Sequence, residues 1–295
     1  MVLMVSGRTD VPAFYSSWFV NRYREGFLDV RNPFNPKLVS RINFTNVDLI
    51  MFCSKNPEPI IKYLKEINKP ILFHITLTPY ENDIEPYVPQ KGKVINSIKK
   101  ISKILGKENV VVRYDPILLS EKYTLEYHIK MFDDLCKRLD GYIEKIIISF
   151  LDEYKNVIKN KKYLKYREFT LNDFESIGKN FSKSAKEHNI SVQTCFEDFN
   201  LVEYGFIKGE CLSHELAYKL TGKEYKDWKA RGKGNCHCVS MVDVGSYNTC
   251  KHMCRYCYAN YDEKKVNENN LKHNPKSSLL IGELLKDDII KERVK

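Results

Sequence analysis

Two apolar runs on either side of a helical segment decide the fold class of this chain: PILFHITL at residues 70–77 and VVVRYD at residues 110–115, with KVINSIKKISKIL at residues 93–105 between them. Both runs are short, rich in β-branched residues and almost continuously apolar, which is typical of strands buried on both faces. The segment between them is amphipathic with the spacing of a helix. This order of elements predicts parallel pairing through a right-handed crossover.

The same alternation of strand and helix runs through residues 1–200. Repeated units of this kind favour an α/β fold with a TIM-type (β/α) barrel over an open doubly wound sheet. Pro12 and Pro57 fall near the start of helical runs, where Pro is well tolerated. Further strands are expected at residues 2–6, 47–53, 145–150, 190–195 and 239–244, and further helices from residue 10, after residue 57, and at residues 124–139 and 170–188.

The alternation fails after residue 200. Residues 201–238 are predicted to form an irregular connector that contains cysteines, and residues 223–234 within it are strongly charged and contain Gly. Residues 239–295 are then expected to supply the last barrel strand, a cysteine loop and a C-terminal helix. The chain shows no internal repeat and no long low-complexity tract.

Composition and charge limit the class of protein. The 295 residues are 43% hydrophobic and carry a net charge of +10, which permits an anionic partner such as nucleic acid. No tight cluster of Lys and Arg interleaved with aromatic residues supports such a partner. No apolar run approaches the length that spans a bilayer, and the first residues lack the pattern of a secretory signal. A cytoplasmic protein without a membrane segment is therefore expected.

Nine cysteines are many for a cytosolic protein, and seven of them fall within residues 195–257. Without a secretory signal, a disulfide framework is the poorer explanation of this crowding, and metal binding is the better one. The two remaining cysteines, Cys53 and Cys136, are expected to be buried small hydrophobic residues.

The most informative passage is Cys250-Lys-His-Met-Cys254-Arg-Tyr-Cys257. Three thiolates can hold three irons of a [4Fe–4S] cluster, and the fourth iron is then open to a small molecule. Chelation by the amino and carboxylate groups of S-adenosylmethionine requires such an open position. Reduction of its sulfonium would release a 5′-deoxyadenosyl radical. His252, within the passage, is expected to be an exposed loop residue.

Structural zinc is the main alternative reading of these cysteines. Zinc prefers four closed ligands, often supplied as two-cysteine pairs, and the passage lacks a second pair. The segment Cys236-His237-Cys238 could supply further ligands. Four upstream cysteines could also close a site of their own, an auxiliary [4Fe–4S] cluster or a zinc site, or could be buried thiols; they are Cys195, Cys211, Cys236 and Cys238.

Residues 249–260 resemble the CxxxCxYC element of radical S-adenosylmethionine enzymes, including the spore photoproduct lyase branch. The whole chain resembles DUF1848, a domain family of unknown function whose C-terminal cysteines are likened to that radical cluster. This second resemblance implies a cofactor but no substrate. The matching segments are residues 6–15, 32–34, 54–57, 113–116, 149–150 and 245–260.

The position of the cysteines departs from the radical enzymes, in which the element follows the first barrel strand. A partial barrel with a circular permutation reconciles the two: residues 239–244 take the place of the usual first strand, and residues 2–6 take that of the second. The resemblance then implies that Ser6, Gly7 and Arg8 lie near the methionine end of the cofactor. It places Tyr256 beside the adenine.

Three charged residues at predicted strand ends are candidates for catalysis, because barrel active sites form at the carboxyl ends of strands. Lys55 could bind a carboxylate or phosphate, and Asp115 could orient a hydroxyl group. Arg113 could face the cofactor or the substrate. Lys55 and Asp115 could equally form a structural ion pair in the barrel mouth.

These observations predict a radical S-adenosylmethionine enzyme of unknown substrate, supplied with electrons by a protein such as flavodoxin or ferredoxin. Two alternatives stay open. A zinc-stabilised basic protein that binds nucleic acid would be colourless, and its binding would depend steeply on salt. An iron–sulfur electron-transfer protein would carry a cluster without cleaving S-adenosylmethionine.

Overall fold

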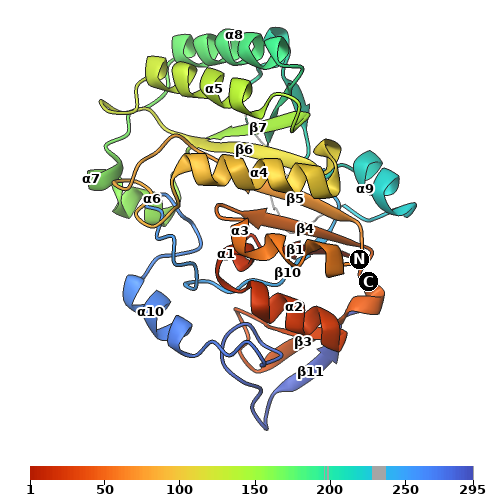
Figure 1. Cartoon of the computed structure of the whole chain (residues 1–295). Helices are drawn as coiled ribbons and strands as arrows, with labels where there is room; N and C mark the ends of the chain where they lie inside the picture. The colour runs from red at the N-terminus through yellow and green to blue at the C-terminus, as the bar shows by residue number, and fades with distance from the viewer. Residues whose placement is uncertain (196, 198, 228–236, 295) are drawn as a thin grey trace.

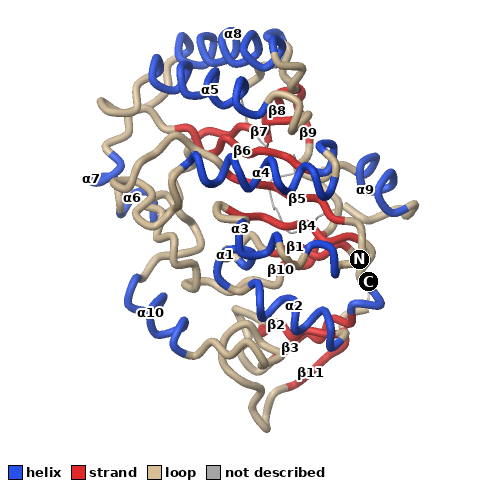
Figure 2. Tube along the Cα trace, in the orientation of Figure 1, coloured by secondary structure: helices blue, strands red, loops and turns tan. Residues whose placement is uncertain are grey.

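Eight parallel strands form the main sheet of the computed structural model, which describes residues 1–195, 197, 199–227 and 237–294. Their order across the sheet is β10, β1, β4, β5, β6, β7, β8, β9 (Figure 1; Figure 2). The prediction of an α/β fold with a parallel sheet is therefore confirmed. The strands are β1 Val2–Val5, β4 Leu49–Ser54, β5 Ile71–Thr76, β6 Val110–Ile117, β7 Lys145–Phe150, β8 Ser191–Cys195, β9 Ile207–Gly209 and β10 Met241–Asp243.

Three long helices cover one face of this sheet: α4 Lys91–Leu105, α5 Leu125–Leu139 and α8 Leu171–Glu187 (Figure 1). All three were predicted from the sequence. The N-caps of α5 and α8 are threonines whose side chains accept backbone N–H groups of the first turn. Of the helices in the described ranges, none is both long and apolar enough to cross a membrane.

The strands of the main sheet other than β9 are largely buried on both faces, as their apolar runs predicted. Successive side chains of a strand point to opposite faces, so Leu3 and Phe73 pack on the helix side while Val2 and Leu72 pack on the other side. That other face is covered by α9 His214–Thr221 and by the segment just before β10. Alternate residues of a strand therefore enter the core on the helix side of the sheet or the core on the opposite side.

The sheet is open, and a closed TIM barrel is not seen among the described residues, where β9 and β10 are the two edges. The predicted irregular connector also contains regular structure, because β9 extends the sheet and α9 covers it. No long buried apolar run marks β9 in the sequence, since it has only three residues and the side chain of Ile207 is 48% exposed.

A second sheet was not predicted. It has the order β11–β3–β2, with β2 Phe27–Arg31 antiparallel to β3 Leu38–Asn43 and β11 Ile289–Glu292 parallel to β3. The predicted C-terminal helix is α10, which precedes β11. The remaining helices are α1 Val11–Phe14, α2 Ser16–Glu25, α3 Glu58–Ile61, α6 Lys155–Lys159, α7 Lys161–Leu164 and α10 Glu263–Leu271, with 3-10 turns at Phe44–Asn46, Leu64–Glu66, Lys107–Asn109 and Val202–Tyr204.

The last strand of the main sheet lies beside the first. Strand β10 pairs in parallel with β1, with Val2 opposite Met241 and Met4 opposite Asp243. This is the adjacency that the predicted permutation requires. It also brings the turn after β1, residues 6–8, next to the start of the cysteine loop.

Candidate metal centre

The cysteine loop, residues 245–262, lies across the carboxyl edge of the main sheet (Figure 1). It is held by segments that follow β5 and β7. Arg255 donates its backbone N–H to the carbonyl oxygen of Ile84 at 2.9 Å. The side-chain amide of Asn156 donates to the carbonyl oxygen of Cys257 at 3.1 Å. The loop thus occupies the edge at which the active sites of βα folds form.

The three thiols of the loop lie close enough to influence one another. Burial raises the pKa of both Cys250 and Cys254 above the ordinary range, and the charge of Cys257 raises each of them further. Cys254 is the most enclosed of the three, with 9% of its surface exposed. The loop therefore presents three thiols together in a largely buried setting.

Backbone N–H groups point at two of these sulfurs. The N–H of Ala259 donates to Cys257 Sγ at 3.3 Å, and Asn260 contributes a second backbone hydrogen bond to the same thiol. A backbone hydrogen bond from His252 reaches Cys250. Hydrogen bonds to ligand sulfurs of this kind tune the potential of iron–sulfur clusters.

The donors are thiols, and they are not gathered around a single point. In the part of the chain that the structure describes, no group of three or more His, Cys, Asp or Glu side chains is placed to hold one metal ion. A cubane cluster makes a different demand, because each of its thiolates binds a separate iron. The soft donor set of Cys250, Cys254 and Cys257 fits such a cluster better than it fits one zinc ion.

Asp10 joins the cysteine loop to the first strands. Its carboxylate accepts from His252 Nε2 at 2.9 Å, from Ser54 Oγ at 2.8 Å and from the backbone N–H of Lys55 at 2.7 Å. It also caps α1 by accepting the N–H of Ala13. The prediction that His252 is an exposed loop residue is wrong, because its surface is 1% exposed. The imidazole instead fastens the loop to the sheet.

A second buried carboxylate, that of Glu85, binds the ammonium groups of two lysines beside the cysteine loop. Lys55 Nζ donates to Glu85 Oε1 at 2.7 Å, and Lys91 Nζ donates to Oε2. The hydroxyls of Thr78 and Tyr256 also donate to Oε1. Burial alone raises the pKa of Glu85, but the two lysines outweigh this effect and lower it to about 2. The carboxylate is therefore ionised and carries the opposite charge to its neighbours.

Lys55 and Tyr256, two of the predicted site residues, meet at this carboxylate. The Lys55 ammonium lies 5.3 Å from the centre of the Tyr256 ring, and its charge acts on the thiol of Cys254. The alternative of an ion pair between Lys55 and Asp115 is wrong, because each has another partner. Lys55 is thus a buried positive charge beside the cysteine loop.

The turn after β1 is tied to the last strand through Asp243, a residue that the sequence analysis missed. Its carboxylate accepts from Ser6 Oγ at 2.5 Å and from the backbone N–H of Gly7 at 3.0 Å. Arg8 Nη2 donates to the carbonyl oxygen of Asp243 at 2.8 Å, and Tyr258 donates its hydroxyl to the carbonyl oxygen of Gly7. An acidic residue at the end of the last strand was the signal that could have identified it.

Replacing Gly245 with alanine is expected to destabilise this junction by about 1–3 kcal/mol. A Cβ at this position would lie 1.9 Å from Ser6 Oγ, so the Ser6–Asp243 hydrogen bond would have to give way. Urea denaturation of the variant measures the loss. Gly92→Ala in α4 is the control, since its Cβ would meet only Arg138 Nη2 at 3.6 Å. Equal stability of the two variants would contradict the prediction.

Arg113 and Asp115 form an ion pair on β6 that faces the upstream cysteines. Arg113 Nε donates to Asp115 Oδ2 at 2.8 Å, and Arg113 Nη1 donates to Cys211 Sγ at 3.0 Å. Cys195 Sγ lies 2.9 Å from Cys211 Sγ. Hydrogen bonds from Cys195 and Cys238 hold the pKa of Cys211 well below its ordinary value. Cys236, the fourth predicted member, lies outside the described residues.

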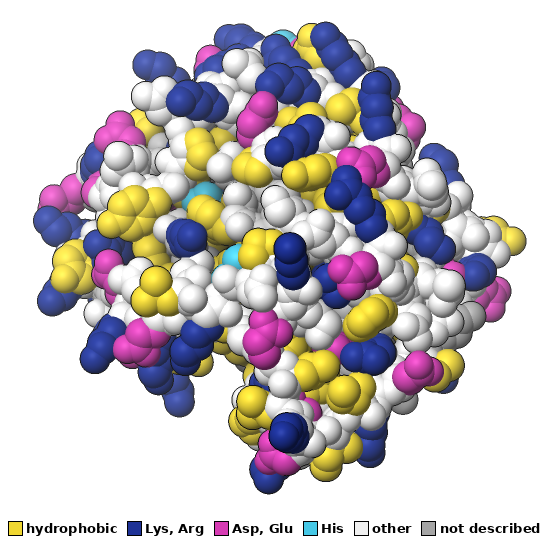
Figure 3. All heavy atoms as spheres, turned by 60° about the horizontal axis from the view of Figure 1, so that its bottom comes forward, with side chains coloured by type: hydrophobic (Ala, Val, Ile, Leu, Met, Phe, Trp, Pro, Cys, Tyr) yellow, Lys and Arg dark blue, Asp and Glu magenta, His cyan; other side chains and the backbone are white. Residues whose placement is uncertain are grey.

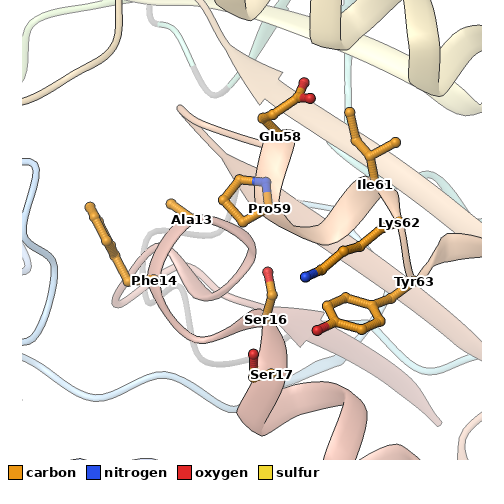
Figure 4. Close-up of a pocket in the computed structure, with 9 residues that line it drawn as sticks. All are labelled: Ala13, Phe14, Ser16, Ser17, Glu58, Pro59, Ile61, Lys62 and Tyr63. Atoms are coloured by element: carbon orange, nitrogen blue, oxygen red, sulfur yellow. The ribbon is translucent and has the colours of Figure 1, made fainter.

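A surface groove with a volume of about 420 Å³ lies between α1–α2 and α3 (Figure 4). Phe14 lines it, and the ring of Phe14 packs against the ring of His252 with centroids 4.6 Å apart. The groove is thus one side chain away from the cysteine loop. None of the predicted site residues lines it; its walls are Ala13, Phe14, Ser16, Ser17, Glu58, Pro59, Ile61, Lys62 and Tyr63.

The positive charge of the chain is spread over the surface rather than gathered. Figure 3 shows one face, on which Lys and Arg side chains stand apart with Asp, Glu and apolar side chains between them. Many surface cations of the described residues have acidic partners, such as Arg24 with Glu66 and Lys122 with Asp83. The described part of this face therefore offers no single continuous basic patch.

The chain is similar to a known protein family. The family described as "Domain of unknown function (DUF1848)" matches residues 2–259, which include the main sheet and all three cysteines of the loop. No curated protein matches the chain significantly.

Proposed function

The chain belongs to the DUF1848 family, whose function is unknown, and from this premise we propose that it is a radical S-adenosylmethionine enzyme. Cys250, Cys254 and Cys257 would hold a [4Fe–4S] cluster. When bound, such a cluster would supply the one electron that cleaves S-adenosylmethionine into methionine and a 5′-deoxyadenosyl radical. The electron would come from a small reductant protein of the flavodoxin or ferredoxin type.

One observation carries the proposal. Three thiols with spacings of three and two residues lie together on a loop at the carboxyl edge of a parallel sheet, and backbone N–H groups donate to two of them. This spacing supplies three ligands and leaves a four-iron cluster one ligand short, as a bound cofactor requires. The parallel pairing of β10 with β1 also supports the permutation proposed from the sequence, in which β10 would take the place of the usual first strand.

The neighbouring residues would position and tune the site. Asp10 and His252 hold the loop to the sheet, and Lys55 places a positive charge beside Cys254 that favours its thiolate form. Ser6, Gly7 and Arg8 would bind the methionine end of the cofactor, because their link to Asp243 and Tyr258 keeps them beside the loop. Asp115 and Arg113, which form an ion pair on β6, would contact the substrate or the cofactor.

The test begins with anaerobic purification and analysis of iron, sulfide and zinc, followed by dithionite reduction with S-adenosylmethionine. At least about four irons and four sulfides per chain are expected. 5′-Deoxyadenosine should form and should fall by more than about 100-fold in Cys254→Ala, because a ligand of the cluster is lost.

Cys136→Ala is the matched control, since Cys136 is a buried thiol of α5 that lies outside the cysteine loop. It should keep both the iron and the deoxyadenosine. A colourless protein with stoichiometric zinc and no cleavage would refute the proposal in favour of a zinc-stabilised binding protein. Iron and sulfide without any cleavage would favour an electron-transfer protein.

A further inference from the structure

Two thiols outside the cysteine loop lie in contact inside the fold, on the face of the main sheet opposite α4, α5 and α8. Cys195 ends β8, and Cys211 comes shortly after β9. Their sulfur atoms are 2.9 Å apart, which exceeds the covalent sulfur–sulfur length of about 2.05 Å. Both cysteines are therefore reduced thiols in this structure, with their sulfurs already side by side.

Backbone pairing fixes the positions of these two thiols. Strand β9 runs parallel to β8 with Gly209 opposite Cys195, so Cys211 is two residues beyond the residue that pairs with Cys195. The side-chain amide of Gln193 on β8 donates to the carbonyl oxygen of Glu210 at 2.9 Å and holds the chain directly before Cys211. The contact between the two sulfurs thus follows from the pairing of two neighbouring strands.

The two thiols differ in their access to solvent. Cys195 is 7% exposed and belongs to the apolar core on this face of the sheet. Cys211 packs against that core but is only partly buried. A small reagent in solvent therefore reaches the sulfur of Cys211 first, and Cys195 lies behind it.

Arg113 makes Cys211 the more reactive of the two. Its guanidinium donates from Nη1 to Cys211 Sγ at 3.0 Å, while its Nε donates to Asp115. A charged donor beside a sulfur favours the thiolate, which is the form of cysteine that attacks oxidants. The pair thus combines a partly exposed, activated thiol with a buried thiol in contact with it.

We propose that Cys211 and Cys195 form a redox-active dithiol, which a peroxide oxidises to a disulfide and a dithiol reductant restores. The Cys211 thiolate attacks one oxygen of hydrogen peroxide, the O–O bond breaks, and the departing hydroxide takes up a proton to become water. The sulfur of Cys195 then attacks the sulfenic acid of Cys211. The disulfide forms as the hydroxyl group leaves with the thiol proton as a second water.

Two electrons pass from the two thiols to one peroxide in this sequence. The disulfide also takes the sulfur anion away from Arg113, which then keeps Asp115 as its partner. Transient disulfides of this kind are the ones expected in a reducing compartment. This proposal does not depend on the function proposed for the cysteine loop.

The test treats the anaerobically purified full chain with a small excess of hydrogen peroxide and follows each cysteine by differential alkylation and peptide mapping. The thiols of Cys195 and Cys211 should disappear together, at least about 10-fold faster than the thiol of Cys136, and a disulfide-linked pair of peptides should appear. Dithiothreitol should restore both thiols. Cys136 is the internal control, since it is a buried thiol of α5. The mapping counts the loop cysteines separately, so failure of the radical proposal would leave this result unchanged.

Two variants identify the partner of Cys211. Cys195→Ser should stop the reaction at the sulfenic acid of Cys211, which dimedone captures. Cys238→Ser should still form the Cys195–Cys211 disulfide, although Cys238 is hydrogen-bonded to the same sulfur. Circular dichroism checks that both variants fold, and the mapping of the unaltered chain decides the question without them.

Three results would overturn the proposal. The first is a Cys211–Cys238 disulfide in the oxidised chain. The second is a pair of thiols at Cys195 and Cys211 that outlasts Cys136 in peroxide. The third is iron or zinc bound to these two thiols in the protein as purified.

Discussion

Replacing Glu85 with glutamine is expected to lower the free energy of unfolding by about 3–5 kcal/mol. The substitution keeps the shape of the side chain but leaves the ammonium groups of Lys55 and Lys91 without their counter-charge. Both are largely buried, with 14% and 24% of their side chains exposed, while that of Glu85 is 1% exposed. Removing one partner of a buried ion pair lowers the free energy of unfolding far more than removing one partner of a surface pair.

Urea denaturation at neutral pH measures this loss, and Glu81→Gln is its matched control. Glu81 lies in the same segment after β5 and pairs with Lys122 at 2.9 Å, but its side chain is 66% exposed. The control should change stability by less than about 1 kcal/mol. Equal losses in the two variants would show that Glu85 contributes no more than a surface carboxylate.

The pH dependence of the Glu85 effect has a definite sign. Its pKa is lowered from 4.5 to about 2 in the folded protein, so its contribution is fully present above pH 4.5. The contribution is lost as the pH falls toward 2, because the folded state then takes up the proton as well. The stability difference between wild type and Glu85→Gln should therefore shrink across that window.

Replacing Asp10 with alanine is expected to cost about 3 kcal/mol or more, because one carboxylate satisfies four donors. The variant would lose the cap of α1 and leave the imidazole of His252 and the hydroxyl of Ser54 without their acceptor. It should also reduce the iron that the cysteine loop retains, since His252 would no longer hold the loop to the sheet. Denaturation and iron analysis of the same preparation test both effects.

Thr124→Ala separates the two roles of Asp10. Thr124 caps α5, outside the cysteine loop, by accepting the N–H of Tyr127 at 3.2 Å, and helix capping alone is worth about 1 kcal/mol. Its replacement should leave the iron content unchanged. If Asp10→Ala behaved like Thr124→Ala in both measurements, Asp10 would be a helix cap and nothing more.

The strands of the main sheet other than β9 were predictable, because a strand that is buried on both faces has a nearly continuous apolar sequence. The helices α4, α5 and α8 were predictable from their amphipathic spacing. The second sheet was not, since β11 joins residues 289–292 to residues 38–41 and its four side chains are all exposed. Closure of the main sheet could not be decided either, because it depends on whether edge strands meet rather than on any local pattern.

That three cysteines lie on one loop could be read from their spacing, but the residues that hold this loop could not be predicted. Asp10 stands at the start of a predicted helix and caps it, but nothing local in the sequence revealed its hydrogen bond to His252, 242 residues away. Glu85 follows no strand directly and belongs to no motif. Its importance comes from two lysines that the fold brings to it from β4–α3 and α4. Long-range electrostatic pairing of this kind leaves no periodic signal in a sequence.

The position of β10 beside β1 has a consequence for how the protein is made. Among the strands of the main sheet, β1 is synthesised first and β10, with the cysteine loop after it, is synthesised last. One edge of β1 therefore stays unpaired until β10 has left the ribosome. Exposed edges recruit strands from other chains. Protection of this edge by a chaperone is therefore expected to raise the yield of folded protein.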